Sequence, residues 1–284
     1  MALASLGAAW SGIGSAPKRT AGNYATCAQG FAEVTIGGFA DDARTAGVDH
    51  PDEMGRRSRQ LEAPQATALI VRRQVVIPAE GASLPGSLTV PAAAAGVVAF
   101  AHGSGSSRFS PRNTRVAAVL HEARLATLLF DLLTPGEGLD RRNVFDVSLL
   151  AERLLAATSW LEAESELCQL RIGYFGASTG AAAALRAAAE NPAVAAIVSR
   201  GGRPDLAGPY LRKVRAPTLL IVGGLDETVL ELNRTALELL PCEAELRIVE
   251  GATHLFEEPG TLDQVATLAR DWFVGHLAGV ARDD

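Results

Sequence analysis

The chain has 284 residues, of which 48% are hydrophobic and 20% are charged, and its formal net charge at pH 7 is −6. This composition is ordinary for a soluble globular protein with a sizeable core. The acidic balance and the lack of a basic cluster argue against a nucleic-acid partner. Because no stretch approaches about 20 uninterrupted apolar residues, no membrane span is predicted.

The three cysteines, Cys27, Cys168 and Cys242, are odd in number and lie far apart. They form no CxxC pair and no metal-ligand cluster with the five histidines, so we expect neither a metal site nor a cofactor. The first 14 residues lack the positive charge that precedes the apolar run of a secretory signal. Together these features predict a cytoplasmic protein with inert thiols.

Residues 1–66 are rich in Gly, Ala, Asp and Arg and show little apolar periodicity. This predicts a flexible or weakly ordered N-terminal extension, in which only residues 31–40 (FAEVTIGGFA) could dock as an extra strand. From residue 67 onward, short apolar runs alternate with helical patterns. Residues 67–284 are therefore predicted to form one catalytic domain.

Eight apolar runs are predicted as strands. A hairpin is expected over residues 72–78 and 83–90, and six buried strands at 96–101, 126–130, 170–175, 194–199, 218–222 and 245–249. Between them, Ser110 before Pro111 predicts one helix start, and Thr261 with Gln264 predicts a capping box for the last helix. Alternating strands and helices predict an α/β fold with a doubly wound, mostly parallel sheet flanked by helices, whose ligands bind at the carboxyl ends of the strands.

The strongest chemical signal is Gly176-Ala177-Ser178-Thr179-Gly180, a match to G-x-S-x-G. It lies between the predicted strand LRIGYF and an alanine-rich helix, which is the context that this motif needs to present a serine nucleophile. Glycines on both sides remove side chains that a sharp turn would crowd. The pattern predicts Ser178 as nucleophile, and the alternative is a glycine-rich helix start used for packing or phosphate binding.

A serine hydroxyl needs a base to take its proton, and that base needs an acid to orient it. His254 follows the last predicted strand and is the predicted base. Asp226 follows the strand TLLIV and is the predicted acid, with Glu227 and Asp131 as rivals. The order Ser178, Asp226, His254 is the one that α/β-hydrolases use.

The segment HGSGSSRFSPRN, from His102 to Asn113, directly follows the predicted strand GVVAFA. Acyl transfer needs hydrogen-bond donors for the developing oxyanion, and the backbone N–H groups of Thr179 and of Gly103 or Ser104 are the candidates. His102 is expected to brace this loop rather than to transfer a proton. Arg108 is a candidate contact for a carboxylate-bearing substrate, with a surface salt bridge as the alternative.

Taken together, AHGSGSSRFSPRN, GYFGASTGAAAAL, VSRGGRPDLAG, LLIVGGLDETV and VEGATHLFEEPG resemble the dienelactone-hydrolase-like branch of the α/β-hydrolase fold. Dienelactone hydrolase proper has a cysteine nucleophile, so Ser178 implies ordinary ester or thioester hydrolysis instead. Similar domains occur fused behind a phosphoribosyltransferase domain. Residues 1–66 are too short for that domain and show no recognisable phosphate-binding loop, so transferase activity is not expected.

The resemblance also implies a site without a large cap, and only residues 200–217 separate two of the predicted strands. An open site favours a small-molecule ester with a short acyl group. The leading hypothesis is therefore a serine esterase. The alternatives are a thioesterase, acyltransferase or perhydrolase with the same triad, or a hydrolase-like binding domain with little turnover. The sequence leaves homo-oligomerisation, the natural substrate and the pathway open.

Overall fold

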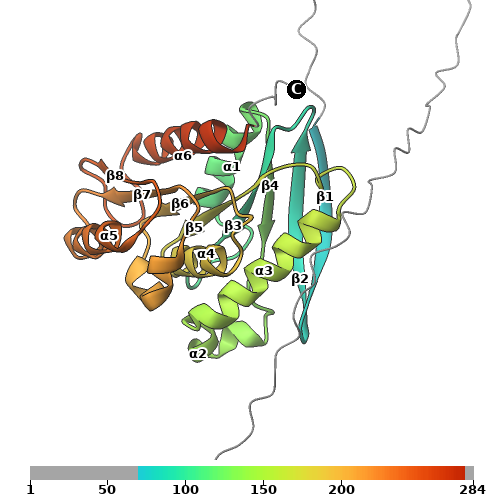
Figure 1. Ribbon diagram of the computed structural model, residues 1–284, viewed down its shortest axis with the longest axis horizontal. Coiled ribbons are helices and arrows are strands. Elements are labelled where there is room, and N and C mark those ends of the chain that lie inside the picture. The colour runs from blue at the N-terminus through green and yellow to red at the C-terminus, as the bar shows by residue number, and fades with distance from the viewer. Residues whose placement is uncertain (1–69, 279–284) are drawn as a thin grey trace, which may run out of the picture. The chain divides into compact units, whose positions relative to one another are not determined.

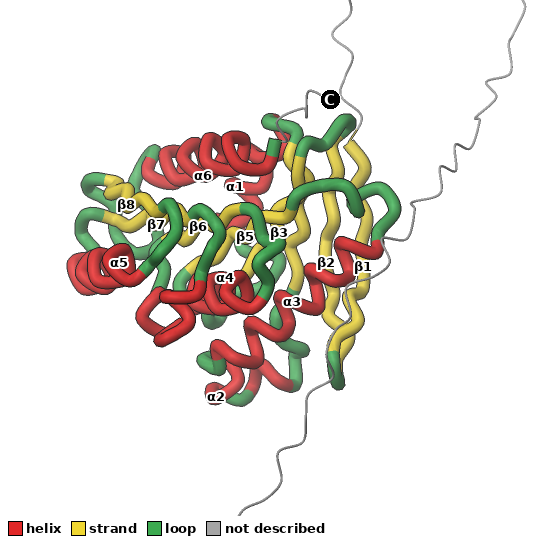
Figure 2. The backbone as a smooth tube through the Cα atoms, viewed as in Figure 1, coloured by secondary structure: helices red, strands yellow, loops and turns green. Residues whose placement is uncertain are grey.

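The computed structural model describes residues 70–278, which form a single eight-stranded sheet covered by helices on both faces (Figures 1 and 2). The strand order is β1-β2-β4-β3-β5-β6-β7-β8. Strands β1 (Ile70–Ala79) and β2 (Ala82–Pro91) form an antiparallel hairpin, and β2 also pairs antiparallel with β4. The remaining strands are parallel: β3 (Gly96–Ala101), β4 (Leu125–Phe130), β5 (Ile172–Ala177), β6 (Ala196–Arg200), β7 (Thr218–Gly223) and β8 (Ala244–Val249). The predicted α/β-hydrolase architecture is confirmed.

Two apolar layers hold the helices on the sheet. Helices α1 (Pro111–Glu122) and α6 (Thr261–Leu277) pack on one face, where Phe100 and Phe175 stack with ring centroids 4.9 Å apart. Helices α3 (Val147–Ala163), α4 (Thr179–Glu190) and α5 (Glu227–Leu239) cover the other face. Shorter helical segments, η1 (Glu137–Leu139), α2 (Arg141–Val144) and η2 (Pro204–Lys213), follow the carboxyl ends of β4 and β6. Strands β3 to β7 are buried along their whole length, which explains their uninterrupted apolar runs.

Two strands begin two residues later than their sequence patterns predict. The backbone N–H of Leu170 donates to Leu167 O, and that of Val194 donates to Asn191 O, so both residues belong to turns. Of the two predicted helix starts, one is confirmed and one is wrong. Ser110 caps α1 as predicted, because its hydroxyl accepts from the N–H of Asn113. The predicted capping box of α6 is wrong: Gly260 is the capping residue, at φ 78°, and the Thr261 hydroxyl donates instead to Glu258 O.

No helix of the described residues is both long enough and apolar enough to cross a membrane. The connection between β6 and β7 holds only η2, so this part of the chain carries no large cap there.

The predicted N-terminal extension, residues 1–66 with the segment 31–40, lies outside the described residues. We predict that residues 1–66 are dispensable for catalysis. Since the described strands begin at Ile70, a variant that starts at Thr67 keeps every one of them. We expect this variant to fold and to keep the ester-hydrolysis rate of the full chain. Insolubility, or an altered acyl preference measured with a series of esters, would assign part of residues 1–66 to the catalytic domain.

A histidine at the end of α1 gives the fold a pH-dependent stability. Nε2 of His121 lies 2.7 Å from the hydroxyl of the fully buried Thr127 in β4. Burial, and next the charge of Arg72, lower the pKa of His121 from 6.5 to about 4. Between these two pH values the unfolded chain binds a proton that the folded chain does not, so acid favours unfolding.

We therefore expect the free energy of unfolding to be fully retained above pH 6.5 and to fall as the pH drops toward 4. A half-buried ring is partly screened by solvent, so the loss should be about 1–2 kcal/mol rather than the larger value that the whole shift implies. Urea titrations at pH 7 and pH 4.5 measure it. In His121→Gln the difference in unfolding free energy between the two pH values should be smaller. An equal difference in both proteins would show that other groups cause it.

Candidate active site

The strand-to-helix turn at Ser178 has the geometry of a nucleophile elbow. Ser178 follows β5, precedes α4, and has φ 50° and ψ −121°, a strained backbone for a residue with a side chain. A Cβ on Gly176 would lie 2.4 Å from Ala181 Cα, and one on Gly180 would lie 2.2 Å from Ala101 O. Both glycines are therefore required by the close approach of helix and strand, as the motif predicts. The turn leaves Ser178 partly exposed at the helix N-terminus.

The structure brings Asp226 and His254 together from the loops after β7 and β8. His254 Nδ1 lies 2.6 Å from Asp226 Oδ2, and an ionised carboxylate only accepts, so the ring nitrogen donates. The Asp226 side chain is 16% exposed and that of His254 is 37% exposed. Of the predicted rivals, Glu227 begins α5 with an exposed side chain, and Asp131 pairs with Arg108. In a neutral ring this bond leaves the proton on Nδ1 and makes Nε2 the acceptor nitrogen.

The loop after β6 links the serine to the histidine. Ser178 donates its backbone N–H to Arg200 O and accepts from the N–H of Arg203. Between these two residues, a Cβ on Gly201 would lie 3.5 Å from His254 Cε1 and Nδ1, so the imidazole packs directly on this glycine. Among the described residues no hydrogen bond joins the Ser178 hydroxyl to His254. Such contacts often tighten only when substrate binds.

The residues predicted to supply oxyanion donors, Thr179 and Gly103 or Ser104, come from two segments beside Ser178. Thr179 is the first residue of α4, so its N–H has no acceptor within the helix. Gly103 packs against Ser178, since a Cβ there would lie 3.1 Å from Ala177 O and 3.2 Å from Ser178 Cβ. In the described part of the chain, neither Gly103 nor Ser104 donates its backbone N–H to another residue. The predicted donors are thus placed beside the serine and are uncommitted.

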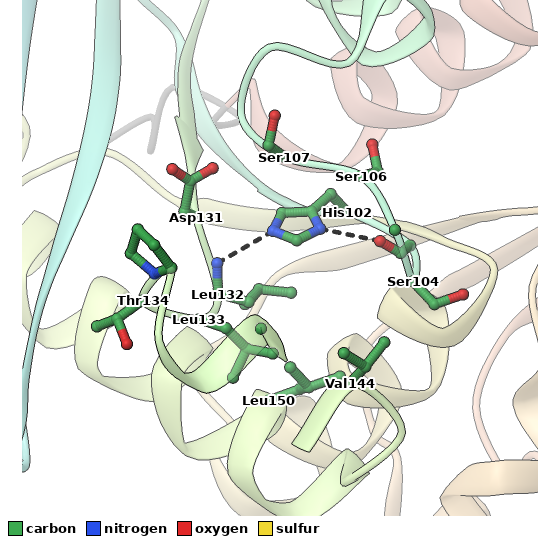
Figure 3. Close-up of a pocket in the computed structure, with 14 residues that line it drawn as sticks. His102, Ser104, Ser106, Ser107, Asp131, Leu132, Leu133, Thr134, Val144 and Leu150 are labelled. Carbon is green, nitrogen blue, oxygen red and sulfur yellow. Dashed lines mark hydrogen bonds between the residues drawn. The ribbon is translucent and has the colours of Figure 1, made fainter. Parts of the chain in front are cut away.

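His102 braces the loop that carries Gly103, as its position after β3 suggests (Figure 3). The N–H of Leu132 donates to His102 Nε2 at 3.1 Å, and His102 Nδ1 donates to Gly103 O at 3.0 Å. These partners fix a neutral ring with its proton on Nδ1. Burial lowers the pKa of His102, which keeps the ring neutral. Because both nitrogens are engaged, His102 has no free position for a proton in transfer.

Arg108 is held in a salt bridge, which is the alternative that the sequence left open. Its guanidinium pairs with Asp131, and its backbone N–H donates to Asp131 Oδ1 at 2.7 Å. The guanidinium also lies over the Phe109 ring, 4.1 Å from the centroid. The pair fastens the loop after β3 to the start of the loop after β4. Binding of a substrate carboxylate by Arg108 would require this pair to open.

The loop after β6 lies in VSRGGRPDLAG, a segment of the family resemblance, but no motif in the sequence predicted a role for its residues at the site. Arg200 is 6% exposed, its Cζ lies 5.9 Å from the Phe256 ring centroid, and its Nε has no partner among residues 70–278. Burial, and next the charge of Arg112, lower the pKa of Arg200 to about 10. Arg203 and Gly201 position the backbone around Ser178 and His254. Gly201-Gly202 after a buried strand indicate a turn, but they do not predict the contact of Gly201 with His254.

A cavity of about 270 Å³ opens beside the Gly103 loop (Figure 3). Fourteen residues from the loops after β3 and β4, from η1, α2 and α3 line it, and neither Ser178 nor His254 is among them. The described residues contain no group of three or more His, Cys, Asp or Glu side chains that could hold a metal ion. The site therefore consists of a serine elbow, an Asp-His pair, backbone donors and a neighbouring cavity.

This arrangement defines an α/β-hydrolase-type enzyme domain. The sequence model of the dienelactone hydrolase family matches residues 140–272, which include all three predicted triad residues. A dienelactone hydrolase from Anabaena variabilis is 54% identical in sequence, with a TM-score of 0.72 over 73% of this chain and 99% of that one. The chain belongs to the dienelactone hydrolase family.

Two further proteins resemble the chain, one in sequence and one in fold. A Mycobacterium tuberculosis protein with the provisional name phosphoribosyl transferase is 59% identical over 207 residues, which are 72% of this chain and 47% of that protein. The chain thus spans about half the length of the curated relatives it matches. The esterase domain of a Rhodothermus marinus protein shares the fold at 20% identity, with a TM-score of 0.59 over 72% of this chain and 99% of that one.

Proposed function

We propose that the chain is a serine esterase that cleaves small carboxylic esters through Ser178, His254 and Asp226. The observation that carries the proposal is the Asp226–His254 hydrogen bond, formed against the loop that also holds the backbone of Ser178. This is the arrangement of acid, base and nucleophile that acyl transfer to serine needs. Membership of a hydrolase family supports the same reaction class.

In the proposed reaction Ser178 Oγ bonds to the ester carbonyl carbon while His254 Nε2 takes the hydroxyl proton. The carbonyl oxygen becomes an oxyanion that accepts from Thr179 N–H and from the backbone of residues 103–104. The C–O bond to the alcohol then breaks, and His254 returns the proton to the departing oxygen. Water repeats the cycle on the acyl-enzyme and releases the carboxylic acid.

The test is hydrolysis of p-nitrophenyl acetate by the purified full chain, with a fluorophosphonate probe in parallel. We expect turnover, and one phosphonyl group per chain on the peptide that contains Ser178. A thioester substrate and an added alcohol acceptor distinguish hydrolysis of oxygen esters from the thioesterase and acyltransferase alternatives. Ligand binding without turnover would instead support the binding-domain alternative.

Metal removal should leave this activity unchanged. The proposed mechanism takes its base from His254 and its oxyanion donors from the backbone, so it assigns no step to a metal ion. We expect the same initial rate before and after dialysis against EDTA. A rate that falls with chelator and returns with zinc would contradict the triad mechanism.

The transferase name belongs to relatives of which only 47% is matched. The geometry of residues 70–278 gives no reason to carry that activity over, so it is not proposed here.

A further inference from the structure

The cavity beside the loop after β3 is lined by polar residues of that loop and by aliphatic residues of other segments. Serine side chains of the loop after β3 line one side of it (Figure 3). The opposite wall carries the aliphatic side chains of Leu132, Leu133, Val144 and Leu150, from the loop after β4 and from α2 and α3. Its volume of about 270 Å³ lies near the lower end of ligand pockets, so it suits a short chain or one small ring rather than a large ligand.

Gly103 lies between the cavity and Ser178. This residue lines the cavity and also packs on Ser178, where its Cβ would come within 3.2 Å of the serine Cβ. The side chains that line the cavity follow β3 and β4, which lie on one side of β5 in the sheet (Figure 1). Asp226 and His254 follow β7 and β8, which lie on the other side. The cavity and the histidine therefore flank Ser178 from opposite directions.

The positions of the cavity and His254 on opposite sides of Ser178 indicate where the acyl group and the alcohol of an ester would lie. His254 must reach the departing oxygen to return its proton, so the alcohol lies on the histidine side of the carbonyl carbon. The oxyanion is directed at the backbone donors. The acyl chain, which is the remaining substituent on the carbonyl carbon, therefore points away from His254. We propose that the cavity is the acyl-binding pocket of the enzyme and that Val144 limits the length of the acyl chain. The assignment rests on the serine esterase function proposed above.

The wall of the cavity also sets the chemical class of the acyl group. None of the fourteen lining residues is Lys or Arg. The single carboxylate among them, Asp131, is paired with Arg108. A carboxylate on the acyl chain would lose its hydration without gaining a free cation, whereas methylene groups gain apolar contact. The pocket thus fits a neutral, aliphatic acyl chain.

Val144 is a suitable position for testing the pocket. It is the last residue of α2 and is half-buried, and it lies outside the buried apolar clusters that hold the helices to the sheet. Its neighbour Phe145 is exposed and does not line the cavity. Val144→Phe narrows the pocket and Val144→Ala extends it, while Phe145→Ala is the matched control beside it.

The experiment compares kcat/KM for p-nitrophenyl esters from acetate to decanoate, in the full-length chain and in each variant. For the unaltered chain we expect the values to rise from acetate, pass a maximum and fall once the chain outgrows the cavity. Val144→Phe should lower the hexanoate-to-acetate ratio by about tenfold, since one misfitting methylene in an apolar pocket costs that much. Val144→Ala should move the maximum to longer chains, and Phe145→Ala should leave it in place.

A second series holds the acyl group at butyrate and varies the alcohol. We expect Val144→Ala to leave the preference among alcohols unchanged. A shift in alcohol preference instead of acyl preference would overturn the assignment, as would acyl profiles of both Val144 variants that match that of Phe145→Ala. If acetate hydrolysis remains sensitive to Ser178→Ala in those cases, the pocket alone is misassigned. If no hydrolysis depends on Ser178, the esterase function falls as well.

Discussion

Replacing Ser178 with alanine should lower kcat/KM for p-nitrophenyl acetate by about 10⁴-fold or more while the protein stays folded. The Ser178 hydroxyl is the group that attacks the carbonyl carbon in the proposed reaction. Its removal opens almost no cavity, because Ser178 is only partly buried and its hydroxyl makes no hydrogen bond among residues 70–278. The strained backbone at φ 50° is the same for serine and alanine, so the melting temperature should change little.

The matched control is Ser87→Ala. Ser87 lies in β2, and its hydroxyl contacts Gln74 of the hairpin partner, far from the elbow in the strand order. We expect this variant to keep the unaltered rate. Circular dichroism and the melting temperature report whether each variant is folded. A folded Ser178→Ala protein that still hydrolyses the ester and still takes up the fluorophosphonate would place the nucleophile elsewhere.

Strands β3 to β7 could be predicted because they are buried on both faces, and such strands appear as continuous apolar runs. The edge strand β8 is mostly not buried, yet the run predicted over residues 245–249 also became a strand. The strand boundaries differ from the prediction where an apolar residue lies in a turn. Leu170 and Val194 continue the apolar pattern of β5 and β6, yet their N–H groups bond within turns. Hydropathy does not distinguish an N–H in a ladder from one in a turn.

Asp226 and His254 come into contact because the fold collects the carboxyl ends of its parallel strands at one edge, where Ser178 also lies. Ser178, Asp226 and His254 each follow a strand, so their proximity follows from topology. Contacts between remote segments could not be predicted in the same way. The pairing of Arg108 with Asp131 and the cavity wall at Val144 depend on how the loops after β3 and β4 fold together. No periodicity or motif in the sequence encodes those contacts.

Replacing Asp226 with asparagine should also cost about 10⁴-fold in kcat/KM at neutral pH, the size of the effect measured for the equivalent change in a serine protease. Asp226 Oδ2 accepts from His254 Nδ1, which leaves Nε2 as the acceptor for the serine proton. An asparagine amide can turn its NH₂ toward Nδ1 and make that nitrogen the acceptor. The ring proton then moves to Nε2, where it blocks proton abstraction from Ser178.

The neighbouring carboxylate supplies the control for this prediction. Glu227→Gln removes a negative charge one residue away, on an exposed side chain at the start of α5. If the Asp226–His254 bond fixes the tautomer, Glu227→Gln keeps the unaltered kcat/KM and Asp226→Asn loses it. Both variants should retain their melting temperature, since neither side chain belongs to a buried apolar cluster. The reverse pattern would make Glu227 the acid, because then the loss of charge at residue 227, rather than the tautomer set by residue 226, would govern the rate.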